Sequence, residues 1–325
     1  MPLNASFFIK KKESQHMTTI PFAQLKKSLT AIALLLLVTT LPLLSSCSKD
    51  KDTEEERTEQ NINRNDDTVQ PELSRLEFPR VKGGNSVVLV HTTGDSWGVN
   101  YCVEWDKDKK SQRWSCYQLN STNSVTKTSR YYSDSNQYPM DPMLPSADYM
   151  SRDLIYGSSY EHGHICPSAD RLYSYNANLQ TFYLTNMQPQ DHIMNSGKNY
   201  DSPWYRLEGQ VRSWANASAT ENLFVVKGGT IEDHQLRETV KGELRVPKYF
   251  FVALLLKNAQ GYKACAFWME HDGKDHGSEP LSNFAVNVRT LEQMTGIDFF
   301  CNLPDDTEEH VETLPIENVK RAWGL

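Results

Sequence analysis

Residues 160–171 carry the densest group of side chains with catalytic potential in this chain. They are two imidazoles, two carboxylates, a thiol and a guanidinium, namely His162, His164, Glu161, Asp170, Cys166 and Arg171. A histidine with a pKa near neutrality can accept a proton from water while a phosphodiester is attacked. Gly163 lets the backbone approach a substrate or a metal, and Pro167 fixes the turn that follows. We therefore take His164 as the candidate general base.

A zinc site is a second interpretation of the same segment. His162, His164 and Cys166 are ligand types that zinc prefers, and alternate residues of a strand point to one face. No further ligand pair with a recognisable spacing follows, which disfavours zinc. A purely structural histidine bonded to the backbone is another alternative for His164.

Three polar residues further along the chain could complete a site with His164. Asn195 follows the turn signal at residues 188–190, and Glu208 and Arg212 lie four residues apart on one face of an expected helix. Singly, the asparagine would be an ordinary turn former and the Glu–Arg pair an ordinary surface salt bridge. Their joint order after His164 is the informative signal.

The elements that must position these residues mix strands and helices without a regular βαβ alternation, which favours an α+β fold. Apolar patterns predict strands at residues 87–91, 98–105, 113–119, 181–187, 223–226, 246–256 and 264–269. Ser202 as N-cap and Pro203 at the first helical position begin a helix. A second helix spans residues 288–295 and stops at Gly296. The polar residues 121–145 form a long loop.

Residues 1–46 have the pattern of a secretory signal. Lys26 and Lys27 precede an apolar run at residues 31–44, and small residues lead to Cys47. This ending resembles the lipobox of bacterial lipoproteins, which predicts lipidation at Cys47 and anchoring in the cell envelope, with the outer membrane as the expected place. An ordinary signal peptide with a chance cysteine is the alternative.

Residues 47–72 are polar and almost free of apolar side chains, so we expect a disordered acidic tether. Residues 73–325 then form one domain, which is long enough for a large core. The chain has 34 Lys and Arg against 41 Asp and Glu, a net charge of -7. This balance disfavours a tight, sequence-reading nucleic-acid binder, although an enzyme needs only a local basic cleft.

Five cysteines follow Cys47, in an expected oxidising compartment. Cys102 and Cys116 flank a polar turn and would face each other in a symmetric hairpin, so a disulfide between them is one expectation. A bond between Cys265 and Cys301 has less support and would leave Cys166 as the odd thiol. The sequence does not determine the connectivity.

Taken together, the motifs resemble those of the sugar-non-specific DNA/RNA endonuclease family, the ββα-metal nucleases marked by Asp-Arg-Gly-His. Residues 161–164, Glu-His-Gly-His, occupy that motif, and residues 185–190, Thr-Asn-Met-Gln-Pro-Gln, match the next block. Trp204, Leu207, Glu208 and Arg212 match the following helix, and residues 291–300 resemble the closing helix and strand. The resemblance implies an α+β fold with an antiparallel-rich central sheet and flanking helices.

The family resemblance also implies a metal-dependent hydrolysis of DNA and RNA that leaves 5′-phosphates. His164 would be the general base for in-line attack, Asn195 the only direct side-chain ligand of Mg²⁺, and Glu208 would orient the waters of the ion. Mn²⁺ could replace Mg²⁺ in an oxygen-rich site. An inserted turn at residues 198–202 makes Asn199 a rival ligand, although the spacing from the preceding block favours Asn195.

The same resemblance assigns residues to the substrate. Arg212 and, less directly, Arg130 match phosphate-contacting arginines of the catalytic site, while Glu161, His162 and Arg171 lie in or beside the substrate-binding motif. The family's Asp-Arg is replaced here by Glu-His at residues 161 and 162. Because a neutral imidazole lacks the permanent charge and the two-point phosphate binding of arginine, we expect weaker substrate affinity than in an arginine-bearing relative.

A non-catalytic surface lipoprotein that captures nucleic acid on a nuclease fold is the competing function. Binding alone requires basic residues rather than a general base and a metal ligand. The joint presence of His164, Asn195 and Glu208 therefore favours the enzyme.

Overall fold

The computed structural model describes residues 60–94, 98–149 and 157–325, all of which belong to one compact unit, residues 56–325. The expected secretory signal, the lipidation residue Cys47 and the first part of the expected tether lie outside the described residues. Among the helices of the described part, none combines the length and the apolar character that crossing a membrane requires.

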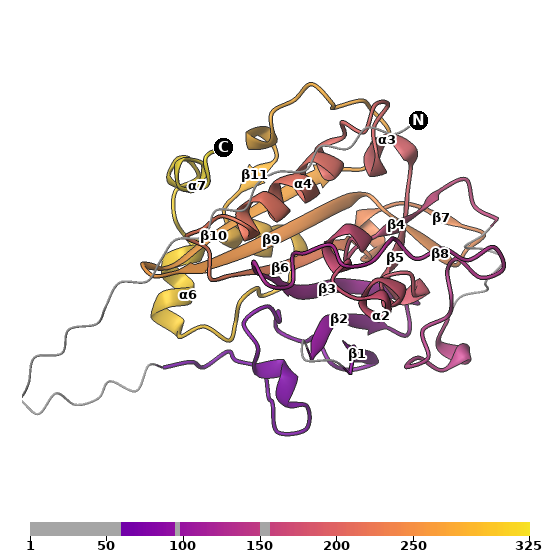
Figure 1. Cartoon of the computed structure of the whole chain (residues 1–325), viewed down its shortest axis with the longest axis horizontal. Helices are drawn as coiled ribbons and strands as arrows, with labels where there is room; N and C mark the ends of the chain where they lie inside the picture. The colour runs from indigo at the N-terminus through magenta and orange to yellow at the C-terminus, as the bar shows by residue number, and fades with distance from the viewer. Residues whose placement is uncertain (1–59, 95–97, 150–156) are drawn as a thin grey trace, which may run out of the picture. The chain divides into compact units, whose positions relative to one another are not determined.

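A seven-stranded antiparallel sheet forms the centre of the fold (Figure 1). In their order across the sheet its strands are β1 (Ser86–Thr92), β2 (Val99–Asp106), β3 (Ser111–Leu119), β6 (Asn222–Gly229), β9 (Tyr249–Asn258), β10 (Gly261–Glu270) and β11 (Ala285–Val286). Two antiparallel pairs accompany it, β4 (Glu161–His164) with β5 (Met187–Gln190) and β7 (Leu236–Val240) with β8 (Leu244–Pro247). The α+β class is therefore confirmed.

The described helices are short, apart from one. The α-helices are α2 (Tyr175–Gln180), α3 (His192–Asn195), α4 (Pro203–Ala215), α5 (Val288–Thr295), α6 (Asp305–Glu312) and α7 (Ile316–Trp323). The 3₁₀ turns are η1 (Pro71–Ser74), η2 (Ser146–Asp148), η3 (Ser168–Arg171), η4 (Leu184–Asn186), η5 (Asp233–Gln235) and η6 (Leu281–Asn283). Figure 1 shows α4, the longest of them, lying along the long strands of the sheet.

Two apolar clusters cover the central sheet. Tyr101 and Val103 of β2 belong to the cluster that also contains Trp204 of α4, whereas Cys102, between them in the chain, belongs to the cluster of α5 and α6. Successive side chains of a strand point to opposite faces, so the two clusters lie on opposite faces of the sheet. The face that carries α4 also carries Ile165, the residue that follows β4.

Most of the expected strands and both expected helices are present, with two corrections. Most of residues 181–187 do not form a strand, because Thr181 ends α2 and η4 follows. The strand is β5, which begins at Met187 and ends three residues after the expected end. Residues 246–256 form parts of two strands, β8 and β9, that separate at Lys248. Helix α5 has the expected bounds and ends at Gly296 in the left-handed conformation, with φ of 68°.

The folded part begins before residue 73. The Asn61 side chain donates to the Leu303 carbonyl at 2.7 Å, and the Asn65 amide donates to the Pro79 carbonyl at 3.0 Å. Residues 60–72, expected to belong to a disordered tether, are therefore ordered against the domain. An asparagine-rich sequence can make such contacts because each side-chain amide both donates and accepts hydrogen bonds.

The cysteines of the described part all carry free thiols. Cys102 and Cys116 are direct partners in the β2–β3 register, as the symmetric hairpin predicted, but no disulfide joins them. Cys265 and Cys301 are likewise unbridged.

Candidate active site

The β4–β5 pair carries the Glu-His-Gly-His motif and requires its glycine. In the register of the pair, Gly163 lies opposite Gln188 and His164 lies opposite Met187. A Cβ atom on residue 163 would lie 2.2 Å from Oε1 of the buried Gln190, closer than atoms can approach. The Gln188 amide joins the pair to the central sheet, because its Oε1 accepts from the Gly229 N–H at 2.6 Å.

His164 has the environment of a neutral base. Its ring packs edge-on against Phe182, with 4.7 Å between the centroids, and its Nε2 is enclosed without a hydrogen-bond partner among the described residues. Burial, followed by the positive charge of Arg130, lowers the pKa of His164 to about 3. The imidazole is therefore unprotonated at neutral pH and can accept a proton at Nε2.

Helix α3 presents Asn195 to the motif. Its N-cap, Asp191, accepts from the Met194 N–H at 2.7 Å and forms an ion pair with Arg237. The Asp191 N–H also donates to Nε2 of the buried His271 at 2.9 Å. These contacts hold the start of the helix, so the position of its last residue, Asn195, is fixed as well.

Glu161 orients the side chain of Asn195. The Asn195 Nδ2 donates to Glu161 Oε2 at 2.7 Å, and the His192 Nδ1 lies 2.8 Å from Glu161 Oε1. With the amide nitrogen held by the carboxylate, the acceptor oxygen of Asn195 is directed away from Glu161. Asn199, the rival ligand, is exposed in the turn after α3, and its N–H donates to Asp201.

Helix α4 begins as predicted and is linked to Asn195. The Ser202 hydroxyl caps the helix by accepting from the Tyr205 N–H at 3.0 Å, and Pro203 occupies the first turn. The same hydroxyl lies 3.4 Å from the Asn195 carbonyl oxygen, to which it donates. The end of α3 and the start of α4 are therefore held together.

Glu208 and Arg212 form ion pairs with residues outside α4 rather than with each other. Glu208 Oε1 lies 2.7 Å from the ammonium of Lys227 on β6, and Arg212 lies 2.8 Å from Asp170 Oδ1. Asp170 also accepts from the Tyr117 hydroxyl at 2.9 Å. The alternative reading of residues 208 and 212 as a surface salt bridge is therefore wrong.

Arg130 and His162 lie beside His164. The Arg130 guanidinium lies over the Phe182 ring, 4.8 Å from its centroid, although Arg130 belongs to the long polar loop. His162 stacks on Tyr138 with 4.1 Å between the ring centroids, and burial lowers the pKa of His162. His162 is therefore neutral at neutral pH, as its replacement of an arginine led us to expect.

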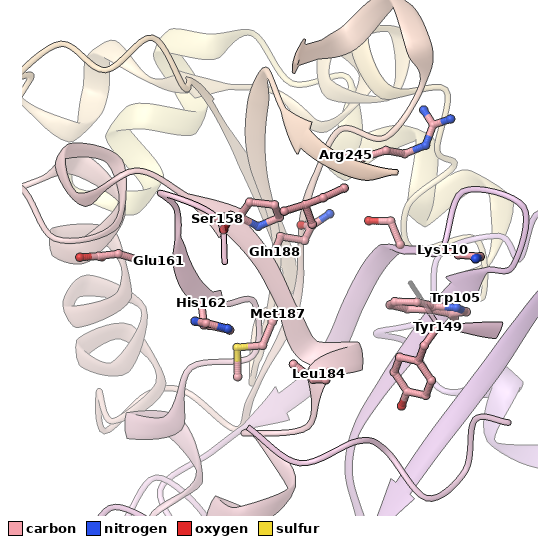
Figure 2. A pocket seen from close by; sticks show the side chains of 13 residues that line it. Trp105, Lys110, Tyr149, Ser158, Glu161, His162, Leu184, Met187, Gln188 and Arg245 are labelled. Carbon is pink, nitrogen blue, oxygen red and sulfur yellow. The ribbon is translucent and has the colours of Figure 1, made fainter. Parts of the chain in front are cut away.

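His162 also lines a small pocket of about 30 Å³ (Figure 2). Its other labelled residues are Trp105, Lys110, Tyr149, Ser158, Glu161, Leu184, Met187, Gln188 and Arg245. Figure 2 shows the Glu161 carboxylate pointing away from Trp105 and Tyr149. The pocket has room for one or two water molecules.

Two expectations for this segment are corrected. Arg171 is 1% exposed and donates to the carbonyls of Asp170 and Gln118, so its guanidinium supports the fold and has no surface to offer a substrate. The zinc interpretation fails, because in the described part of the chain no group of three or more His, Cys, Asp and Glu residues could hold a metal ion. Burial also raises the pKa of the Cys166 thiol to about 12, which opposes the thiolate that zinc needs.

Sequence reasoning missed Lys227 and His192. Lys227 is the only charged residue of β6, inside an otherwise apolar run that ends in two glycines. A lysine at a position expected to be buried was the available signal, since buried lysines require a partner. His192 gave no signal, because its partner Glu161 is 31 residues away.

The fold and this site together define a class. Two short strands followed by a helix, with a histidine on the first strand and an asparagine before the long helix, form the ββα-metal nuclease fold. A chain in a crystal structure of the EndoG/EndoGI complex is similar to the structure of this protein, with a TM-score of 0.55 and 21% identity over 68% of this chain and 89% of that chain.

Residues 93–306 match the family described as DNA/RNA non-specific endonuclease, and the chain belongs to that family. The mitochondrial nuclease EXOG of Xenopus laevis is 27% identical over 222 residues, which are 64% of this chain and 58% of that protein. A nuclease of Nostoc sp. is 28% identical over 66% of this chain and 75% of its own length. The nuclease of Serratia marcescens is 25% identical over 69% of this chain and 83% of its own length.

Proposed function

We propose that this protein is a Mg²⁺-dependent endonuclease that hydrolyses DNA and RNA without sequence specificity and leaves 5′-phosphate ends. The observation that carries the proposal is the β4–β5–α3 arrangement. It combines a neutral imidazole whose Nε2 has no partner among the described residues with an asparagine whose amide is oriented by Glu161.

The residues fit a magnesium ion. Mg²⁺ prefers oxygen ligands and keeps several of its waters, so one asparagine oxygen and a nearby carboxylate suffice on the protein side. Asn195 would hold the ion through Oδ1, since its Nδ2 is engaged by Glu161. Glu208 would accept hydrogen bonds from the waters of the ion. A bound Mg²⁺ would neutralise the charge that develops on the phosphate oxygens.

The protein groups then have distinct roles. His164 would take the proton of the attacking water at Nε2. Its lowered pKa leaves the ring unprotonated at neutral pH and also makes it a weaker base than a free imidazole. Arg130 and Arg212 would hold the phosphate backbone with charged donors. No step uses the ribose 2′-hydroxyl, which is why both DNA and RNA are expected as substrates.

We also propose that the protein is a lipoprotein of the cell envelope, anchored through Cys47. Support comes from the sequence alone, in the apolar run at residues 31–44 and the small residues before Cys47. The variant Cys47→Ser should move the protein from the membrane fraction to the soluble fraction. A wild-type protein that is already soluble after export would contradict the anchor.

End-mapping of the products tests the proposed chemistry. The wild-type protein, with Mg²⁺, should cut labelled DNA and RNA of several sequences. The fragments should carry 5′-phosphates and should therefore be ligatable without prior phosphorylation. Chelation of the metal should stop the cleavage. Binding of both nucleic acids without any cleavage would instead support the alternative, a non-catalytic surface protein on a nuclease fold.

A further inference from the structure

Two buried charges beneath α4 hold the two residues that the proposed mechanism takes from this helix. Glu208 and Arg212 are four residues apart and therefore lie on one face. Lys227 of β6 pairs with the first, and Asp170 of η3 pairs with the second. The face of α4 that carries both residues is thus fixed to the central sheet by one ion pair and to η3 by another, in addition to the apolar contacts.

Lys227 is unusually enclosed for a lysine. The residue is 2% exposed, and its ammonium lies 2.7 Å from Glu208 Oε1 and 4.2 Å from the centroid of the Trp204 ring. Trp204 and Glu208 are one helical turn apart, so the ammonium touches two consecutive turns of α4. A buried ammonium is costly unless it is paired, and its partner here is a carboxylate at the edge of the site.

Lys227 and Glu208 are in direct contact, and little space surrounds the pair. A cavity of about 10 Å³, lined by Lys227, Glu208, Asp170 and Trp204 among others, lies between α4 and the sheet. That volume is at the lower limit for one water molecule. The Glu208 carboxylate is thus held by direct contact on one oxygen, while 17% of its side chain stays exposed toward the solvent side.

We propose that Lys227 is a positioning residue of the active site, which fixes the Glu208 carboxylate so that its free oxygen faces the water shell of the metal. The inference rests on the proposed function, because that function assigns the orientation of these waters to Glu208. Lys227 does not contact the substrate. It acts through Glu208 and adds a fixed positive charge beneath the site, which also contributes to the lowered pKa of His164.

Substitution of Lys227 should affect turnover more than substrate binding. With Lys227→Met we expect kcat on plasmid DNA to fall by about tenfold to a hundredfold, as for other residues that orient the surroundings of a metal. The KM should change by less than about threefold, because the substitution removes no contact that binds the ground state and the transition state of the substrate equally. The Mg²⁺ concentration for half-maximal activity should rise, and Mn²⁺ binding to the substrate-free protein, followed by electron paramagnetic resonance, should weaken. The variant Lys227→Arg should recover part of the activity.

The matched control is Lys257→Met. Lys257 of β9 forms an ion pair with Glu221 at 3.3 Å, but its side chain is 41% exposed and distant from the motif in the chain and in the sheet register. It should keep the wild-type kcat and metal dependence. Equal kcat and metal dependence in folded Lys227→Met and Lys257→Met would overturn the proposal.

A double variant keeps the test decisive if Lys227→Met folds poorly. In Glu208→Gln the target of Lys227 is already neutral, so adding Lys227→Met should lower kcat by no more than about twofold, because coupled residues are non-additive. A further loss of kcat of about tenfold or more on the Glu208→Gln background would show that Lys227 does not act through Glu208. A wild-type protein that cleaves no nucleic acid with Mg²⁺ would overturn the proposed function and this inference together, whereas an active wild type with additive losses overturns only the inference.

Discussion

The protonation state of His164 determines when the proposed base is active. A base acts only when unprotonated, and burial together with the charge of Arg130 holds the pKa of His164 far below the 6.5 of an ordinary histidine. The acid limb of kcat/KM, which reports the free enzyme, should therefore lie below about pH 5 rather than near 6.5. Arg130→Gln removes a positive charge and should move this limb to higher pH. An acid limb at or above 6.5 in the wild type would contradict the assignment.

The substitution of His162 for an arginine leads to a prediction about affinity. His162 is neutral and stacked on Tyr138, so it contributes no permanent charge to the substrate. The variant His162→Arg should lower the KM for DNA by roughly tenfold, the value of one charge-assisted hydrogen bond. The logarithm of the binding constant should also depend more steeply on salt, by about one unit of slope. Unchanged affinity and salt dependence would show that residue 162 does not reach the phosphate.

Residue types and spacing select His164, Asn195, Glu208 and Arg212 as candidates, because the family motif ties each role to a position. They did not reveal the partners, since Lys227 is 19 residues from Glu208 and Asp170 is 42 residues from Arg212. Arg171 was misassigned for a related reason. An arginine beside a motif looks available for a substrate until the fold encloses it with Tyr117, whose ring lies 4.5 Å below the guanidinium.

A side chain at residue 163 of the β4–β5 pair would collide with the Gln190 side chain. In Gly163→Ala the new methyl group would meet the Gln190 side chain, whose buried Oε1 and Nε2 have no hydrogen-bond partner among the described residues. Overpacking of this kind should lower the free energy of unfolding by about 1–3 kcal/mol, measured by urea denaturation. The double variant Gly163→Ala/Gln190→Ala opens the space and should recover most of the loss. Equal stability of both variants would mean that the clash is not the cause.

Local signals predicted the elements whose ends are chemically marked. Helix α4 has Ser202 and Pro203 at its start, and α5 has Gly296 at its end, so both were found. Residues 181–187 have strand-forming side chains but form a turn, because the Asn186 amide donates to the carbonyls of Thr181 and Cys166. A side chain that donates to a backbone carbonyl five residues earlier competes with strand pairing. Strand propensity does not predict such a hydrogen bond.

At the scale of the whole molecule, a group of carboxyl groups lies where the ordered residues 60–72 contact α6. The Asn63 amide donates to Glu308 at 2.8 Å and to Asp298 at 3.2 Å. Both oxygens of the buried Glu312 lack hydrogen bonds within the described residues, although Arg289 lies 3.2 Å away. Burial raises the pKa of Glu308 to about 8 and that of Glu312 to about 10.

These carboxyls should make the protein less stable in alkali. Between the ordinary value of 4.5 and the raised pKa of Glu312, the folded state binds more protons than the unfolded state. Unfolding free energy therefore falls as the pH rises through this window and stops falling above it. Glu312→Gln should flatten the profile, whereas Glu309→Gln, at a side chain that is 66% exposed, should not. A wild-type stability that rises from neutral pH to about pH 9 would contradict the prediction.

The most direct test of the account is the rate at which supercoiled plasmid is nicked by the wild type and by His164→Ala, each with Mg²⁺ and with EDTA. The wild type should nick and then degrade the plasmid only with the metal, and His164→Ala should be slower by about 10²–10⁴-fold, the usual contribution of a general base. Circular dichroism should show that the variant is folded. Cleavage by folded His164→Ala at the wild-type rate, or an intact plasmid after incubation with the wild type and Mg²⁺, would contradict the central claim.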